Sequence, residues 1–254
     1  MINIWKNTST LNNYDEGLNF TEDKEEADIV LMGSQPIDIN DFINLKGIFR
    51  AGIGKDNVPD KQAKDKGIKV IYPSYQTTNI LYEETASFSC SLIFKMLYLD
   101  LGTIDSWSKP SRNKLSNKKL LVIGTGKIGK RVARLMTPFL TVETFDISHN
   151  SMSELEPLMR QANCISIHIP KSKHNDSFFD KEKLSWLKDN TAIVNTARGS
   201  IFDEDALYHE IASNRLTAAF DVFWQEPYNG KLIKFHPNRF FMTPHIASTC
   251  EEFQ

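Results

Sequence analysis

Short apolar runs alternate with amphipathic stretches along most of the chain. In the first third, strand-like runs cover residues 2–5, 27–32, 47–50 and 69–72, with helical patterns at 37–45 and 60–66. A second series of strand-like runs covers residues 119–123, 142–145, 164–169, 192–195, 217–220 and 240–243, with helical patterns at 127–136, 153–161, 180–187 and 203–213. This alternation predicts an α/β protein with mainly parallel sheets.

A long segment of helical character separates the two series. It runs from residue 79 to residue 101 and passes through Ala86, Ile93 and Leu97. We interpret it as a helix that links two domains, because it is too long for a crossover within a small domain. No internal repeat or low-complexity tract interrupts the pattern.

The charge balance excludes several classes of partner. The 254 residues carry a formal net charge of −2, so we expect neither a nucleic-acid interface nor a membrane-binding surface. No apolar run approaches the ~20 residues that cross a bilayer, and residues 1–5 do not resemble a signal peptide. The three cysteines are widely spaced without the pairing of a metal site, which predicts a cytoplasmic protein without bound metal.

A glycine-rich motif directly follows the apolar run 120–123. Gly124, Thr125, Gly126, Lys127, Ile128 and Gly129 have the spacing G-x-G-x-x-G and precede a helical pattern. In a dinucleotide site the first glycine permits the turn, the second lets the backbone approach a pyrophosphate, and the third lets helix and strand pack closely. Amides at the helix N-terminus also favour the phosphates. We therefore predict that residues 124–129 bind a dinucleotide, with an ordinary tight turn as the alternative.

An acidic residue ends the next strand-like run. Asp146 lies about 20 residues after Gly124, the spacing of the carboxylate that accepts hydrogen bonds from the adenosine ribose. Because a carboxylate there repels a 2′-phosphate, Asp146 favours NAD over NADP. His149 nearby leaves some room for NADP, and Asp146 as the cap of a turn is the alternative.

Polar clusters follow three of the later strand-like runs, at residues 195–199, 221–227 and 243–248. Open α/β sheets bind ligands at the carboxyl ends of their strands. Reduction of a keto acid needs a cation for the carboxylate and carbonyl, a proton donor, and a partner that orients the donor. Arg198, His245 and Glu226 supply these three groups. Taken singly, Arg198 in a surface ion pair and His245 as an ordinary loop histidine are the alternatives.

These motifs, together with residues 49–57, resemble those of the D-isomer-specific 2-hydroxyacid dehydrogenases, in the same order and spacing. The phosphoglycerate dehydrogenase branch is the nearest. The resemblance implies two Rossmann-like or flavodoxin-like domains with parallel sheets, the cofactor domain being inserted in a smaller substrate domain. It assigns residues 1–78 to a shortened substrate-binding domain, residues 79–247 to the NAD-binding domain, and residues 248–254 to a tail that heads back towards the first.

The resemblance also implies roles for single residues. Arg198 holds the substrate carboxylate and polarises the C2 oxygen, His245 is the acid/base, and Glu226 orients the imidazole. Asp221 binds the nicotinamide carboxamide, and the remaining expected cofactor contacts are Thr196 and Ala197. A homodimer through the cofactor domain is expected by the same resemblance, with Trp107 near the interface or in a packing role.

The loop formed by Gly52, Ile53 and Gly54 resembles the segment whose amides hold the substrate carboxylate. Adjacent glycines let amides converge on an anion, although an ordinary strand-to-helix turn is the alternative. Gly33 stands where phosphoglycerate-type members carry an arginine, which weakens the case for a phosphorylated substrate. Arg50 either replaces that charge in part or is a structural arginine.

The two ends of the chain depart from the family pattern. Residues 7–24 are too short and polar for the usual first helix and second strand, and residues 251–254 stand where a returning helix begins. We therefore expect a trimmed substrate domain and weaker closure over the site.

The sequence leaves several functions open. The first is an NAD-dependent dehydrogenase of a small D-2-hydroxy acid, with 3-phosphoglycerate among the candidates. The second is an NADH-sensing, corepressor-like binding protein of the same fold with little or no turnover. A paralogue without activity is the third.

Overall fold

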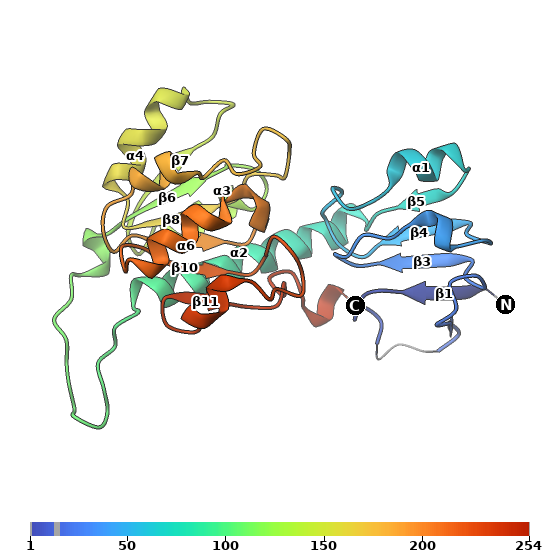
Figure 1. The fold of residues 1–254 in the computed structure, drawn as a ribbon, viewed down its shortest axis with the longest axis horizontal. Helices are drawn as coiled ribbons and strands as arrows, with labels where there is room; N and C mark the ends of the chain where they lie inside the picture. The colour runs from blue at the N-terminus through green and yellow to red at the C-terminus, as the bar shows by residue number, and fades with distance from the viewer. Residues whose placement is uncertain (1, 13–15, 254) are drawn as a thin grey trace. The chain divides into compact units, whose positions relative to one another are not determined.

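The computed structural model describes residues 2–12 and 16–253 (Figure 1). The chain divides into two compact units. The first comprises the residues up to Leu81 together with the segment from Thr249, and the second runs from Tyr82 to Ser248. Each unit contains its own sheet, and all strand pairs within both sheets are parallel among the described residues. The predicted α/β class with parallel sheets is therefore confirmed.

The first unit has the strand order β2-β1-β3-β4-β5, the flavodoxin-like order. Its strands are β1 (Asn3–Lys6), β2 (Asn19–Phe20), β3 (Ile29–Met32), β4 (Gly47–Arg50) and β5 (Lys69–Ile71). The polar segment 7–24 contributes only the short β2, and the described part of this segment contains no helix.

The helices of the first unit agree only in part with the sequence pattern. Helix α1 (Asp60–Asp65) lies where a helix was expected. The helix expected at 37–45 is wrong, since only the 3-10 turn η1 (Ile39–Asp41) forms there. The Asp38 side chain accepts a hydrogen bond from the Asn40 amide at 2.9 Å. Asp and Asn side chains compete in this way with helical backbone bonds.

The second unit has the strand order β11-β10-β9-β8-β6-β7. Its strands are β6 (Lys119–Ile123), β7 (Thr141–Phe145), β8 (Cys164–Ile167), β9 (Ala192–Asn195), β10 (Thr217–Phe220) and β11 (Phe240–Met242). Its helices are α3 (Gly129–Met136), α4 (Leu155–Gln161), α5 (Lys181–Ser185) and α6 (Glu204–Ala212). Short 3-10 turns are η2 (Leu115–Asn117), η3 (Met152–Glu154), η4 (Gly199–Ile201), η5 (Lys231–Phe235) and, in the segment grouped with the first unit, η6 (Glu251–Phe253).

Helices cover both faces of the second sheet. Leu121 and Ile123 of β6 pack in a core with buried residues of α4, α5 and α6. Leu120 and Val122 point to the other face and pack with buried residues of α2 and α3. This period-two alternation on a strand buried on both sides explains why β6 is a continuous apolar run.

The long helix α2 spans Tyr75–Leu97 and therefore begins and ends earlier than the expected 79–101. At its start the Thr77 amide donates to the Ser74 hydroxyl at 3.1 Å, a capping interaction. Beyond its end, the Gly102 amide donates to Asp100 at 3.0 Å, and the chain turns away from the helical path.

Candidate active site

His245 and Glu226 form a hydrogen-bonded pair in the second unit. His245 Nδ1 lies 2.8 Å from Glu226 Oε2, and the Phe223 amide donates to the other carboxylate oxygen at 3.1 Å. An ionised carboxylate only accepts hydrogen bonds, so Nδ1 carries a proton and Nε2 is left to exchange one. The pair has the geometry of an acid/base with its orienting partner.

Arg198 contributes positive charge to the same pair. Burial alone raises the pKa of Glu226, but the hydrogen bond and charge of His245, the Phe223 amide and the charge of Arg198 bring that pKa below its ordinary value. Glu226 is therefore ionised at neutral pH. The Arg198 guanidinium donates from Nη1 to the Ala197 carbonyl at 2.7 Å.

The turn that carries His245 is held by Asp221, the residue after β10. Asp221 is fully buried and accepts hydrogen bonds from the Thr243 hydroxyl at 2.6 Å and from the amides of Ile246 and Ala247, both at 2.9 Å. His245 itself has a φ of +55°, a left-handed conformation that is uncommon outside glycine. Asp221 therefore holds the backbone on which the imidazole is presented.

The glycine-rich loop has the shape that a dinucleotide requires. Gly124 has a φ of +93° and its position leaves no room for a Cβ, which would lie 2.6 Å from the carbonyl oxygen of His168. Gly129, the first residue of α3, packs against Gly124. A Cβ on Gly126 would meet no atom within 4 Å. Packing within the protein thus explains Gly124 and Gly129, whereas open space lies beside Gly126, the glycine that is expected to approach a pyrophosphate.

Asp146 receives hydrogen bonds from both sides. Its Oδ2 accepts from the amide and hydroxyl of Thr125 at 2.7 and 3.0 Å, and its Oδ1 accepts from the amide and hydroxyl of Ser148 at 3.0 and 2.6 Å. The Ser148 and Thr125 bonds hold the pKa of Asp146 well below its ordinary value. Asp146 therefore does cap a turn, and it also places a fixed negative charge beside the glycine-rich loop.

His168 follows β8, next to the glycine-rich loop. Burial lowers its pKa to about 3, and its Nε2 lies 2.8 Å from the Ser166 hydroxyl. The imidazole is neutral at physiological pH and packs near Gly129. These contacts indicate a structural role for His168 beside the glycine-rich loop.

The Gly52–Gly54 loop of the first unit is built around a buried arginine. Arg50 is 5% exposed and donates to the carbonyls of Gly54 at 3.0 Å, Met32 at 3.3 Å and Ala51. Of the two roles considered for Arg50, these contacts support the structural one.

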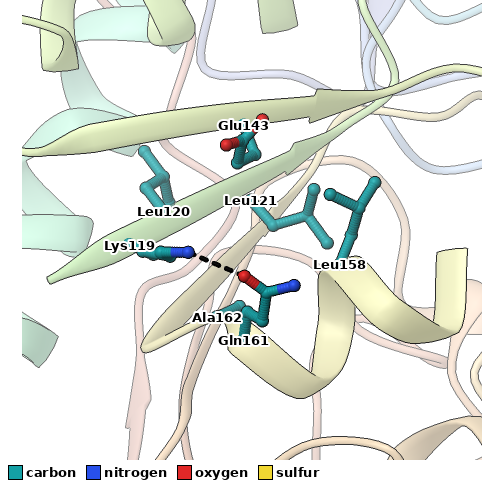
Figure 2. Close-up of a pocket in the computed structure, with 7 residues that line it drawn as sticks. All are labelled: Lys119, Leu120, Leu121, Glu143, Leu158, Gln161 and Ala162. Atoms are coloured by element: carbon teal, nitrogen blue, oxygen red, sulfur yellow. Dashed lines mark hydrogen bonds between the residues drawn. The ribbon is translucent and has the colours of Figure 1, made fainter. Parts of the chain in front are cut away.

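A small hollow lies beside the amino end of β6 (Figure 2). The Lys119 ammonium donates to the Gln161 side chain at 2.7 Å there, and most of the lining comes from Leu120, Leu121, Leu158 and Ala162. It has room for about one water molecule and contains none of the predicted site residues.

The described residues contain no group of three or more His, Cys, Asp or Glu side chains that could hold a metal. In the same part of the chain, no helix is long and apolar enough to cross a membrane.

The structure brings Glu226 and His245 together and places the charge of Arg198 near them. Two supporting contacts were missed by sequence reasoning. The Thr243 hydroxyl holds Asp221, and the Ser89 hydroxyl of α2 lies 2.8 Å from that of Thr196. Both contacts join hydroxyl groups to residues far away along the chain, and the sequence alone offers no signal for such partners.

Known proteins resemble this chain in sequence and in fold. Residues 102–247 match the family described as D-isomer specific 2-hydroxyacid dehydrogenase, NAD binding domain. Hydroxypyruvate reductase of Thermotoga maritima is 31% identical over 250 residues, which cover 90% of this chain and 80% of that protein. D-3-phosphoglycerate dehydrogenase of a Synechocystis strain is 31% identical over 224 residues, and the match covers 83% of this chain but only 40% of that protein.

Among solved structures, D-lactate dehydrogenase of Aquifex aeolicus, complexed with NAD and lactic acid, has a similar fold. The TM-score is 0.80 at 22% identity, and the match covers 99% of this chain and 90% of that one.

Proposed function

This chain belongs to the D-isomer-specific 2-hydroxyacid dehydrogenases, a family of NAD-dependent oxidoreductases, and we propose that it interconverts a small D-2-hydroxy acid and its 2-keto acid. The single observation that carries the proposal is the pair formed by His245 and Glu226 beside the charge of Arg198. An acid/base, its orienting carboxylate and a cation for a carboxylate substrate are what hydride transfer at C2 needs from the protein.

The cofactor is NAD, which when bound supplies or accepts the hydride. Residues 124–129 hold the pyrophosphate in this proposal, because the glycine backbone and the N-terminus of α3 favour an anion there. Thr196 and Ala197 lie on the turn before Arg198 and complete the expected contacts. Asp146, ionised and fixed, binds the ribose and disfavours a 2′-phosphate.

In the direction of keto-acid reduction, protonated His245 donates a proton from Nε2 to the developing C2 alkoxide. Glu226 stabilises the imidazolium and keeps its ring oriented. Arg198 binds the carboxylate and polarises the C2 oxygen, and the amides of Gly52, Ile53 and Gly54 add to carboxylate binding. Oxidation of the hydroxy acid reverses these steps. The fully buried Asp221 holds the turn of His245 in addition to its expected contact with the nicotinamide carboxamide.

Gly33 favours an acid without a phosphate. Its amide donates to the Asn7 side chain at 2.7 Å, and a Cβ at this position would lie 2.8 Å from the Asn7 carbonyl and 2.9 Å from Thr8 Cβ. The cation that phosphoglycerate-type members place here therefore has no room. Since Arg50 is committed to backbone carbonyls, we propose that an unphosphorylated 2-keto acid is preferred over a phosphorylated one.

The deciding experiment follows NADH absorbance with glyoxylate, pyruvate, hydroxypyruvate and phosphohydroxypyruvate. We expect turnover with at least one unphosphorylated acid and a loss of about 10²- to 10⁴-fold in His245→Gln, the range for a removed acid/base. The exposed His174 provides the matched control, His174→Gln, which keeps full activity. Tight NADH binding without turnover of any acid would instead support an NADH-sensing protein.

A homodimer through the cofactor unit is also proposed. The segment between α2 and β6 extends away from the second unit as an open loop (Figure 1). This segment exposes Leu101, Ile104 and Trp107 at 70%, 80% and 69%, and exposed apolar side chains that gather on a surface mark interaction sites. Sedimentation tests the proposal: Ile104→Asp should shift the protein to monomer, whereas Ile43→Asp, at an exposed position of the first unit, should not. An unchanged dimer in Ile104→Asp would exclude this loop as the interface.

A cytoplasmic location stays a prediction. It is supported by the free, buried thiols of Cys90 and Cys164, which a reducing compartment preserves. Imaging of the tagged full-length protein in cells tests it.

A further inference from the structure

The turn that carries Arg198 is spanned by one buried side chain. Asn195, the last residue of β9, is fully buried. Its Nδ2 donates to the Arg198 carbonyl at 2.8 Å, and its Oδ1 accepts from the Ala197 amide at 3.0 Å. Both ends of the amide are therefore used within the three residues that follow the strand.

The same turn fixes the guanidinium. The Ala197 carbonyl accepts from Arg198 Nη1 at 2.7 Å, while the Ala197 amide is held by Asn195. The backbone of Ala197 thus links the buried Asn195 side chain to the Arg198 guanidinium. The end of β9 is also joined to the residue after β10, because the Asn195 carbonyl accepts a hydrogen bond from the Asp221 amide at 3.0 Å.

We infer that Asn195 is a positioning residue for Arg198, which sets where the guanidinium meets the substrate carboxylate. The inference rests on the proposed function for the identity of that carboxylate. A side chain at this place must offer one donor and one acceptor at once, which alanine does not and ionised aspartate does not. Displacement of a binding group by about 1 Å costs on the order of 10²-fold in rate.

Two variants separate positioning from simple structural support. Asn195→Ala should lower kcat/KM for the keto acid by about 10²-fold, a larger loss than that in NADH affinity, because Thr196 and Ala197 are only two of the expected cofactor contacts. Asn195→Asp places an oxygen against the Arg198 carbonyl, which repels an ionised carboxylate but accepts the proton of a neutral one. The activity of Asn195→Asp relative to wild type should therefore rise as the pH falls from 8 to 5, whereas the ratio for Asn195→Ala stays flat. The nearby charged groups, Arg198 on the turn and Asp221 beyond β10, are common to all these proteins and cancel in the ratio.

A matched control lies at the other end of the sheet. Asn163, before β8, accepts from the Lys119 amide at 2.9 Å, so Asn163→Ala also removes a structural hydrogen bond. It should lower stability without changing kcat/KM. If Asn195→Ala behaves like this control, the inference is wrong.

Crystal structures of the wild type and Asn195→Ala decide the matter even without turnover. The inference expects the turn at residues 196–198 to be rearranged and the Arg198 guanidinium displaced. A wild type that reduces no acid overturns the proposed function alone, and an Arg198 that keeps its place in the variant crystal overturns the inference alone.

Discussion

The turns that carry Arg198 and His245 lie at the same edge of one sheet, yet different chemistry holds them. Asn195 is neutral and gives the first turn one donor and one acceptor. Asp221 is a carboxylate that takes three donors from the second turn. The buried side chain at each strand end is matched to the backbone groups that face it, since a buried polar group without a partner is costly.

The two functional side chains also differ in whether their charge changes. Arginine is cationic at every relevant pH, so its turn needs only a fixed position. Histidine gains and loses charge during acid/base chemistry, and two carboxylates, Asp221 and Glu226, feel the charge of His245. The turn whose charge changes is therefore supported by anions, whereas the turn whose charge is constant is supported by a neutral amide.

The largest expected effect comes from removing the charge behind His245. In Glu226→Gln the oxygen that accepts from Phe223 is retained, but the amide nitrogen faces Nδ1 and opposes a doubly protonated ring. We expect kcat for keto-acid reduction to fall by about 10²-fold at neutral pH. Steady-state kinetics with NADH and the keto acid measure the loss.

Glu204→Gln is the matched control, because Glu204 is a partly buried carboxylate of the same unit that accepts from the Tyr228 hydroxyl at 2.7 Å. It should leave kcat unchanged. Equal activity of Glu226→Gln and wild type at neutral pH would show that the charge of Glu226 does not support acid/base chemistry at His245.

Much of the fold follows from the sequence because strands that are buried on both faces consist of consecutive apolar residues. β6, β9 and β10 have the predicted boundaries. Local side-chain chemistry decided the errors: Asp38 caps a 3-10 turn where a helix was expected, and Ser74 starts α2 earlier than its apolar pattern indicates. Such bonds compete with periodicity over only a few residues.

The candidate site was predictable as a set of residues but not as a network. Arg198, Glu226 and His245 stand in recognisable polar clusters after apolar runs. The support from Asp221 depends on atoms 22 to 26 positions away along the chain, and no local pattern encodes which buried group meets which loop. The pairing of β10 with β11 brings the Thr243 hydroxyl to Asp221, and the sequence does not indicate this contact.

The smallest effect is expected from Asp221, and it shows whether the buried carboxylate beside the turn of His245 stabilises or destabilises the fold. Burial raises the pKa of Asp221 despite its three hydrogen bonds, so the folded protein binds this proton more tightly than the unfolded chain. The protonation of Asp221 then contributes fully to the free energy of unfolding below the ordinary pKa near 3.8, and this contribution declines as the pH rises through the folded pKa.

In Asp221→Asn an amide nitrogen replaces one of the two accepting oxygens, which costs about 1–3 kcal/mol. The same change removes the buried charge, which offsets part of that cost at neutral pH. Urea unfolding of both proteins at pH 4 and pH 7 should therefore show a larger difference at pH 4. A larger difference at pH 7 would mean that the hydrogen bonds outweigh burial, and that the charged turn is stabilised by its anion as fully as the neutral turn is by its amide.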